Sequence, residues 1–302
     1  MKAEFNWGRF FLIGIPLLWL LLFFLTPFLI VLKISLSDMA TAMPPYAPAY
    51  EAGSGLLGIW AMIQAMDFEN FIWLLDDNIY WLSYLSSLKI AFFSTIFTLL
   101  LGYPIAYGLA RSPEKWRGFL VLLVILPFWT SFLIRVYAWI GILKSEGFLN
   151  HFLLWLGVID DPLALINTNF AVYIGIVYSY LPFMVLPLYA ALEKMDDSLV
   201  EAALDLGTTR IGAFWQVTFP LSMAGVIAGC FLVFIPAMGE FVIPDLLGGS
   251  ETLMIGKTLW GEFFSNRDWP VASAVAIVLL LLLVVPILLF QRQQEKAQEA
   301  AS

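Results

Sequence analysis

The chain has 302 residues, of which 61% are hydrophobic and 13% charged, and its formal net charge is −8. A soluble domain carries about 25% charged residues, so this composition excludes an ordinary soluble protein and predicts a polytopic membrane protein surrounded by lipid. The single cysteine, Cys230, excludes a disulfide within the chain. The single histidine, His151, belongs to no group of potential metal ligands, so we expect no metal site, and we expect no nucleic-acid partner.

Six apolar stretches are long enough to cross a bilayer, which takes about 20 residues in a helix. They are residues 10–32, 88–110, 119–143, 170–192, 219–242 and 271–290. The runs are continuous rather than alternating, which predicts helices and excludes a β-barrel. The first stretch is too long for the apolar core of a signal peptide. We therefore expect an all-α protein that forms one transmembrane domain over residues 1–302.

The distribution of lysine and arginine predicts the orientation of these helices. With the N-terminus inside, the cytoplasmic segments carry nine of these residues, and the longer outward segments carry six. Both termini are then cytoplasmic, residues 33–87 form an outer loop, and residues 193–218 form a cytoplasmic loop. Prolines such as Pro127, Pro182 and Pro236 interrupt most stretches; they either kink helices around a cavity or are simply tolerated.

Aromatic residues next to polar ones mark the third and fourth stretches. The candidates for a substrate pathway there are Trp129, Thr130, Ser131, Tyr178, Tyr180 and Phe183. Aromatic faces attract alkylammonium groups by about 0.5–2 kcal/mol each, although most aromatic residues in membranes serve packing or the interfacial belt. Arg135 is interpreted as an interfacial cation whose side chain reaches the lipid headgroups.

Carboxylates are frequent on the expected outer side, and Glu240 and Asp245 lie near a span. An ionisable group near a span suggests a role in a pathway. At about 1.5 Å per residue from Phe219, Glu240 is expected near the outer end of the fifth stretch. It is interpreted as an outer-gate carboxylate, or alternatively as a side chain that only reaches the interface. An acidic surface favours a cationic substrate or a basic protein face, or is simply solvated.

The loop 193–218 contains its own helix signals. Ser198 and Glu201 have the spacing of a capping box, and Gly207 is a natural helix stop. Thr208 or Thr209 is expected to cap a second short helix, and Pro220 fits the first turn of the next span. The sequence therefore predicts a helix, a glycine turn and another helix at the cytoplasmic surface.

Two further motifs have a limited meaning. Gly256-Lys257-Thr258 resembles the end of a phosphate-binding P-loop, but the position of the leading glycine is Glu251. The chain itself is therefore not expected to bind ATP, and its energy must come from a partner or an ion gradient. The Gly225-x-x-x-Gly229 motif allows close helix packing, either within the chain or against a second permease.

The spacing of the loop resembles the EAA loop of ABC-importer permeases. The matching residues are Glu201, Ala202, Ala203 and Gly207, followed by Val217 and Phe219-Pro220, where Val217 replaces the usual Ile and Phe219 the usual Leu. On this resemblance, Glu201, Ala202, Ala203 and Gly207 form the coupling helix that docks on an ATPase. Longer runs at 125–139, 239–244 and 266–270 resemble the polyamine branch of these permeases, particularly putrescine importer subunits.

The resemblance implies the type I ABC-importer permease fold with six transmembrane helices in a bacterial inner membrane. It implies a second homologous permease, an ATPase dimer that uses ATP and Mg, and a periplasmic polyamine-binding protein. The chain itself would be non-catalytic and would hold no cofactor. Two alternatives are an ABC permease for another small solute and a gradient-driven carrier; the latter needs charged residues deep in its spans, and those are scarce here.

Overall fold

The computed structural model describes residues 7–49 and 55–301, with the side chains near both ends left out. Lys2 and Glu51 lie outside these ranges, and so do the side chains of Arg9, Arg292 and Lys296, on which part of the orientation argument depends. The chain forms two compact units, Met1–Trp81 with Leu259–Ser302, and Leu82–Thr258. We describe each unit separately.

The first unit begins with a long apolar helix. It consists of α1 (Trp7–Leu20), the π-helical turn η1 (Leu21–Leu25) and α2 (Thr26–Ser35). Two antiparallel strands of two residues each, β1 (Asp38–Met39) and β2 (Tyr46–Ala47), form a hairpin in which Asp38 pairs with Ala47. The other helical elements are α3 (Gly55–Gln64), α4 (Glu69–Asp76), η4 (Gly261–Asn266) and α16 (Trp269–Ala301). Both α2 and α4 pack on α16.

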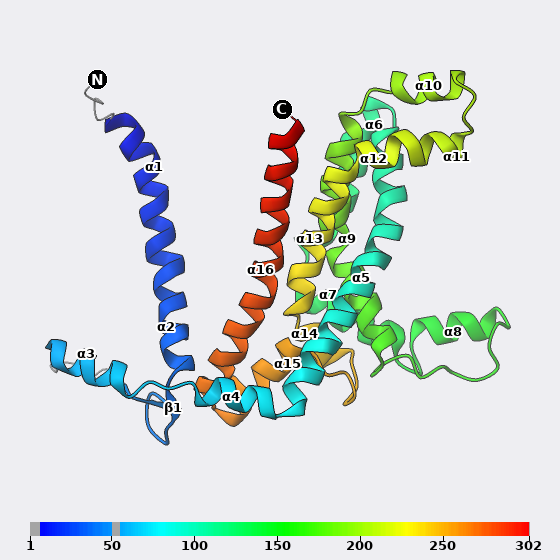
Figure 1. Ribbon diagram of the computed structural model, residues 1–302. Helices are drawn as coiled ribbons and strands as arrows, with labels where there is room; N and C mark the ends of the chain where they lie inside the picture. Colours follow the sequence, from blue (N-terminus) through cyan, green and yellow to red (C-terminus); the bar gives the residue numbers. More distant parts are fainter. Residues whose placement is uncertain (1–6, 50–54, 302) are drawn as a thin grey trace, which may run out of the picture. The chain divides into compact units, whose positions relative to one another are not determined.

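The second unit contains the helices that carry the candidate site residues. After α5 (Asn78–Ala110), which begins in the first unit, come α6 (Glu114–Ile125), η2 (Leu126–Trp129), α7 (Phe132–Leu143), α8 (Phe148–Trp155) and α9 (Asn169–Glu193). Then follow α10 (Ser198–Asp205), α11 (Arg210–Ala213), η3 (Phe214–Thr218), α12 (Phe219–Leu221), α13 (Met223–Met238), α14 (Val242–Leu246) and α15 (Ile255–Trp260). In Figure 1, α9 and α13 lie side by side, and α10 and α11 form a hairpin beyond one end of this pair.

Glycine allows the close packing of α9 and α13. A Cβ atom added to Gly225 would lie 2.7 Å from the Cβ of Ala191, and one added to Gly229 would lie 2.7 Å from the Sδ of Met184. Met184 is fully buried and belongs to the hydrophobic core of this unit, together with Val226 and Val233. The Gly-x-x-x-Gly motif therefore serves packing within the chain, the first of its two interpretations.

The apolar spans agree only in part with the sequence. Among the described residues, three helices are long and apolar enough to cross a membrane, Phe11–Ser35, Asn78–Ala110 and Asn169–Glu193, and two bent pairs raise the number to five. The second span begins ten residues before the expected Leu88 and, at 33 residues, is about 50 Å long. Beyond these, Trp269–Val284 is a shorter apolar helix in the described part of the chain.

The third apolar stretch, 119–143, is not one continuous helix, and its break lies close to Pro127, which the sequence already marks as an interruption. Glu114–Trp129 and Phe132–Trp155 meet at an angle of 89°, because Thr130 and Ser131 have extended backbones. The hydroxyl of Thr130 donates a 2.8 Å hydrogen bond to the carbonyl of Pro127, which offers the backbone a local alternative to helix. A second bend, of 66°, separates Arg210–Leu221 from Met223–Met238 at Ser222, where the hydroxyl of Ser222 bonds the carbonyl of Phe219.

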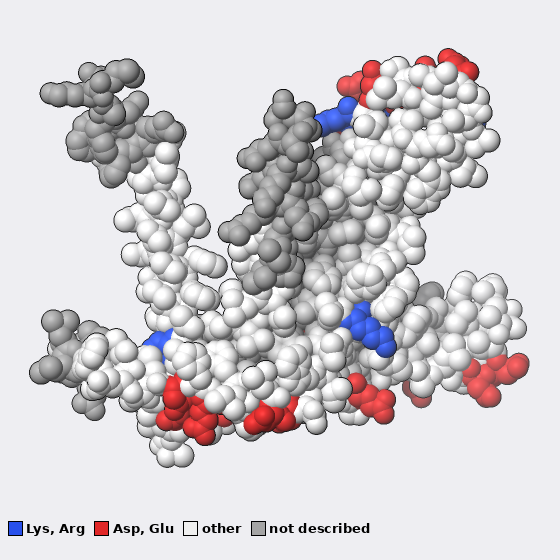
Figure 2. All heavy atoms as spheres, viewed as in Figure 1, with Lys and Arg blue, Asp and Glu red and all other residues white. Residues whose placement is uncertain are grey.

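Charge is distributed as expected for helices that lie in lipid. On the face of the second unit shown in Figure 2, acidic and basic side chains gather toward the ends of the helices, and the surface between them is uncharged. Large apolar side chains of α5, such as Phe92 (53% exposed) and Leu100 (64% exposed), lie on this kind of surface. Exposed apolar side chains of this size are normally covered by lipid or by another protein.

Candidate functional site

The loop after α9 folds as a helical hairpin, as its sequence predicts. Helix α10 (Ser198–Asp205) stops just before Gly207, whose φ of +90° lies in the region that favours glycine. The side chain of Thr209 then accepts a 3.1 Å hydrogen bond from the backbone N–H of Gly212 and caps α11. Pro220 lies in the first turn of α12. The expected glycine stop and threonine cap are confirmed, but Pro220 lies near the end of the helical segment Arg210–Leu221, before the bend, and not in the first turn of α13.

The start of α10 differs from the expected capping box. Ser198 is the first helical residue, and its backbone N–H donates a 2.9 Å hydrogen bond to the carboxylate of Asp196. The hydrogen bonds from Ser198 favour the ionised carboxylate and hold the pKa of Asp196 below its ordinary value. Glu201 therefore does not serve as the far end of a capping box. Its side chain is exposed and makes no hydrogen bond or ion pair with the rest of the described chain.

The hairpin presents apolar side chains to its surroundings. Leu206 is 86% exposed, Ile211 73% and Trp215 59%. Ala202 and Gly207 are also exposed, while Ala203 is half-buried. A contiguous group of exposed apolar residues around a small-residue helix is typical of a protein interface. The geometry is thus compatible with the docking role that the sequence assigns to Glu201, Ala202, Ala203 and Gly207.

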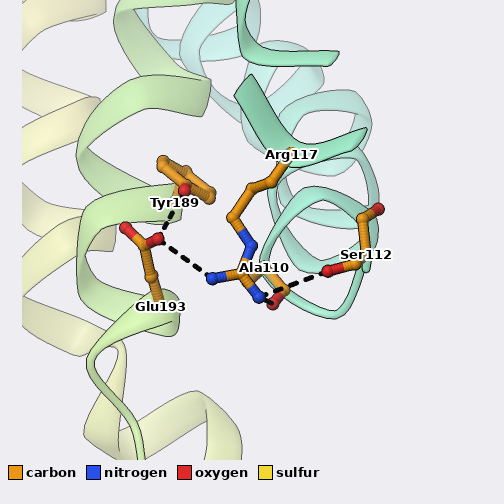
Figure 3. A network of polar contacts seen from close by, with 5 residues as sticks. All are labelled: Ala110, Ser112, Arg117, Tyr189 and Glu193. Carbon is orange, nitrogen blue, oxygen red and sulfur yellow. Dashed lines mark hydrogen bonds and ion pairs between the residues drawn. The ribbon is translucent and has the colours of Figure 1, made fainter. Parts of the chain in front are cut away.

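Two arginines join the turn between α5 and α6 to the segment just before α10. Arg117 donates a 3.1 Å hydrogen bond to the carboxylate of Glu193, and Tyr189 donates one of 2.6 Å to the same oxygen. Figure 3 shows the guanidinium of Arg117 between this carboxylate and the carbonyl oxygens of Ala110 and Ser112, to which it also donates. We call these five residues the Arg117 clamp.

A second ion pair, between Arg111 and Asp197, lies beside the Arg117 clamp. The clamp and this pair fix the end of α9 and the start of α10 against one turn of the chain. Because a guanidinium donates in a fixed fork, the geometry is more specific than a single point charge would allow. The sequence did not predict these contacts, since the paired residues are 76 and 86 positions apart (117 to 193, and 111 to 197).

A pocket of about 460 Å³ opens between α7, α9 and the link from α13 to α14. We call it the Glu240 pocket. It is lined by Phe128, Phe132, Arg135, Ser179, Tyr180, Phe183, Pro236, Gly239, Glu240, Phe241 and Val242. Five of these eleven residues are aromatic, and the pocket contains one acidic and one basic side chain. Such a pocket, largely apolar with a few convergent polar groups, is typical of a small-molecule site.

Glu240 is held in this pocket by three donors. The hydroxyl of Tyr180 donates a 2.5 Å hydrogen bond to one carboxylate oxygen, and the backbone N–H groups of Val242 and Ile243 donate to the other, at 3.0 and 3.3 Å. A carboxylate has about four acceptor positions, so at least one remains for a ligand. The side chain is only 8% exposed.

Glu240 lies just beyond the end of a helix, close to where the sequence predicts it. Helix α13 ends at Met238, so Glu240 lies in the link before α14 rather than on the helix. Its partner Tyr180 is in the interior of the 25-residue helix α9. The burial of Glu240 argues against a side chain that only reaches the interface, and its role as a gate stays a prediction.

Arg135 is placed differently from the expectation. It is buried, at 9% exposure, and its Nε and Nη1 atoms have no hydrogen-bond partner in the described part of the chain. Its guanidinium carbon lies 5.4 Å from the ring centroid of Phe128 and 5.6 Å from that of Phe132. The sequence interpretation of an interfacial cation is wrong, because the bend at Thr130 turns the first residues of α7 into the pocket.

The other expected pathway residues divide into two groups. Tyr180 and Phe183 line the pocket. Trp129, Thr130, Ser131, Tyr178 and Asp245 do not. Trp129 is 72% exposed, Tyr178 packs edge-on against Trp139 at 5.4 Å on another side of α9, and Asp245 pairs with Lys257 at 3.7 Å.

Residues that the sequence did not single out complete the pocket. Phe128 and Phe132 lie close to Pro127 in the sequence, while Ser179 and Phe241 are the direct neighbours of the expected residues Tyr180 and Glu240. A further unexpected group lies in the first unit, where single carboxylate oxygens of Asp38, Asp67 and Glu69 all lie within 4.8 Å of one another. All three residues are exposed, as acidic groups on a solvated surface commonly are.

The solved structures establish the fold. A crystal structure of a bacterial ABC transporter involved in the import of the acidic polysaccharide alginate aligns over 96% of this chain and 96% of that chain, with a TM-score of 0.68 and 16% identity. The same kind of transporter in complex with an alginate pentasaccharide-bound periplasmic protein aligns with a TM-score of 0.67 and 16% identity, over 94% of this chain and 92% of that chain. The expected ABC-importer permease fold is confirmed.

Sequence relatives are much more similar. The spermidine/putrescine transport system permease protein PotB of Salmonella typhimurium (strain SL1344) is 48% identical over 209 residues, which cover 69% of this chain and 72% of that protein. The PotB of Haemophilus influenzae is 40% identical over 277 residues, covering 92% of this chain and 91% of that protein. The expected resemblance to polyamine permeases is thus confirmed.

The family model described as binding-protein-dependent transport system inner membrane component matches residues 9–296, almost the whole chain. Proteins of this family are membrane components of transport systems rather than enzymes. The helical fold, the hairpin at 198–218 and the relatives all agree with that match. The chain therefore belongs to the family of inner membrane components of binding-protein-dependent transport systems.

Proposed function

We propose that this chain is the permease subunit of an ATP-driven importer that moves a polyamine, putrescine or spermidine, into the cytoplasm through the Glu240 pocket. The observation that carries the proposal is a buried carboxylate, Glu240, in a pocket to which five aromatic residues contribute. A carboxylate and aromatic faces together suit an alkylammonium group. The names of the PotB relatives support the same substrate class.

The choice between the two polyamines belongs to this proposal as well. The runs at 125–139, 239–244 and 266–270 favour putrescine, while the names of the relatives include both compounds. The Glu240 pocket is lined by a single carboxylate, so it would hold one ammonium end of the polyamine. The other end would extend out of the pocket. The second permease of the assembly would then contribute to the other end.

We place both termini and the loop 193–218 in the cytoplasm, with residues 33–87 outside and six spans forming one transmembrane domain over 1–302. The lysine and arginine distribution supports this orientation. The two bent pairs and the apolar start of α16 supply the remaining spans. The α10–α11 hairpin then faces the compartment that contains ATP.

The partners follow from this orientation. The exposed apolar hairpin would dock on an ATPase dimer that uses ATP and Mg, a second homologous permease would complete the pathway, and a periplasmic binding protein would deliver the polyamine. Movement of the hairpin would be transmitted to α9 through the turn between α5 and α6. The Arg111–Asp197 pair connects this turn to the start of the hairpin, and the Arg117 clamp connects it to the end of α9. Because α9 also lines the Glu240 pocket, its movement would open or close the pocket to one side of the membrane.

The test is ATP hydrolysis by the complete assembly in lipid, with its binding protein loaded by putrescine, loaded by spermidine, or empty. The proposal expects stimulation by a loaded binding protein. Stimulation by an amino acid or another solute, and by neither polyamine, would retain the ABC permease and overturn the substrate. Absence of any ATPase that copurifies with the chain would point to the gradient-driven carrier.

A further inference from the structure

We propose that Arg135 sets the affinity of the Glu240 pocket. Its positive charge lowers the affinity of the pocket for an ammonium group, so that a bound polyamine is released. This inference rests on the proposed function of the pocket. It assigns to Arg135 an effect on the affinity for the ligand and on its release, and it does not require Arg135 to touch the ligand.

The buried guanidinium of Arg135 is incompletely hydrogen-bonded in the described residues. Its side chain is 9% exposed, and the N–H groups at Nε and Nη1 donate to nothing there. A buried charge with unmade hydrogen bonds destabilises a protein unless other groups offset the cost. An arginine that served packing alone would be replaceable by an apolar side chain of similar size.

The position of Arg135 on its helix adds to this cost. Helix α7 begins at Phe132, and the backbone N–H of Arg135 bonds the carbonyl of Ser131, so the residue lies in the first helical turn. The partial positive charge at a helix N-terminus disfavours a cation. The rings of Phe128 and Phe132 favour the guanidinium, and the carboxylate of Glu240 lines the same pocket.

The same rings and the same carboxylate are the groups that would bind an ammonium ion. Phe128 also packs edge-on against Phe183 at 5.1 Å, and Phe183 lies 6.0 Å from Tyr180, which holds Glu240. The aromatic wall is therefore continuous from Arg135 to Glu240. A ligand cation that binds there shares its surroundings with a fixed charge of the same sign.

The pocket is small enough for this repulsion to matter. Its volume is about 460 Å³, and a sphere of that volume is about 10 Å across, a separation at which two unit charges with an effective dielectric constant of about 20 change an affinity on the order of tenfold. Glu240 attracts the ligand and Arg135 limits that attraction. An importer needs this balance, because a site that binds too tightly does not release its substrate.

The test compares Arg135→Gln with Arg135→Lys, which keeps the charge, in the complete permease and ATPase assembly. Equilibrium binding of labelled putrescine to the assembly without its binding protein is measured first, and maximal ATP-driven uptake second. We expect Arg135→Gln to bind putrescine about tenfold more tightly and to have a lower maximal uptake, while Arg135→Lys behaves as the wild type. A structural role alone would not tighten binding.

Each other outcome also decides the matter. Unchanged or weaker binding by an assembled Arg135→Gln would overturn the role of Arg135. If that variant does not assemble, Arg135→Met, which fills a similar volume without charge, replaces it; failure of both with an intact Arg135→Lys would make the charge structural and would also overturn it. If wild-type protein binds neither putrescine nor spermidine, the proposed function fails first, and the role of Arg135 fails with it.

Discussion

Tyr180 and Glu240, sixty residues apart in the chain, are joined by a 2.5 Å hydrogen bond from the tyrosine hydroxyl to the carboxylate. The bond connects the interior of α9 to the link between α13 and α14. The other carboxylate oxygen accepts from the first N–H groups of α14. The carboxylate is thus fixed in position from two sides while it faces the pocket.

Removing the hydroxyl of Tyr180 should impair transport and leave the fold intact. In Tyr180→Phe the ring remains and one hydrogen bond to a charged group is lost, which is worth about 1.5–3 kcal/mol. We expect polyamine uptake by the reconstituted assembly to fall about tenfold or more. Tyr178→Phe is the matched control, because Tyr178 is on the same helix but packs on Trp139 outside the pocket. Equal losses in the two variants would contradict a special role for the bond.

Gly207→Asp should abolish transport while the protein still reaches the membrane. A residue with a Cβ at φ +90° is strained by about 1–2 kcal/mol, although the space around Gly207 is open, so the substitution mainly misdirects the α10–α11 turn and adds a charge there. The measurement is uptake together with the amount of protein in the membrane.

The control for this variant is Gly157→Asp. Gly157 also has a positive φ, +66°, and open space around it, but it follows α8, far along the chain from the hairpin. We expect that variant to retain uptake. Normal uptake by Gly207→Asp would remove the coupling role from this turn.

Glu201→Gln should lower ATPase activity without destabilising α10. The Glu201 side chain makes no contact that the substitution would break within the described chain, so its charge is available to a partner, and loss of a charged hydrogen bond at an interface is worth about 1.5–3 kcal/mol. We expect roughly a tenfold loss of polyamine-stimulated ATPase in the assembly. Asp205→Asn, exposed on the same helix, is the control; equal effects would indicate a general loss of negative charge instead.

Arg117→Lys tests whether the Arg117 clamp transmits movement. Lysine keeps the charge but loses the fork that holds Glu193 and the carbonyls of Ala110 and Ser112 together. We expect more ATP to be hydrolysed per polyamine imported, because the hairpin would move with less effect on α9. Lys115→Ala, at an exposed neighbouring position, should leave the ratio unchanged. If Arg117→Lys hydrolyses as much ATP per imported polyamine as the wild type, the Arg117 clamp stabilises the local structure and does not transmit movement.

Local chemistry made the hairpin predictable. The helix stop at Gly207 and the cap at Thr209 each depend on neighbours a few residues away, and both are found. Pro220 lies before the bend at Ser222 instead of in the first turn of α13. The capping box at Ser198 failed for a local reason as well, because Asp196 competes for the same backbone N–H. Composition and run length were sufficient to predict apolar helices.

The pocket was less predictable because it depends on contacts between distant segments. Glu240 was singled out for its charge and placed near the end of the fifth stretch, but counting along one stretch gave no sign that it faces Tyr180 of α9. Arg135 was assigned to the interface because the break at Thr130 and Ser131 could not be located from hydropathy. The partners of both residues come from other helices, and no periodicity within one segment contains that information.

The central claim is that a polyamine passes Glu240, and uptake by Glu240→Gln tests it most directly. Glutamine retains an oxygen that can accept from Tyr180 or from the N–H groups of Val242 and Ile243, so the link before α14 should stay folded while the negative charge is removed. ATP-driven uptake of labelled putrescine and spermidine would be measured in vesicles that contain the complete assembly and its binding protein. We predict that wild-type protein imports a polyamine and that Glu240→Gln does so on the order of tenfold more slowly or worse; equal uptake by an equally abundant variant would contradict the account.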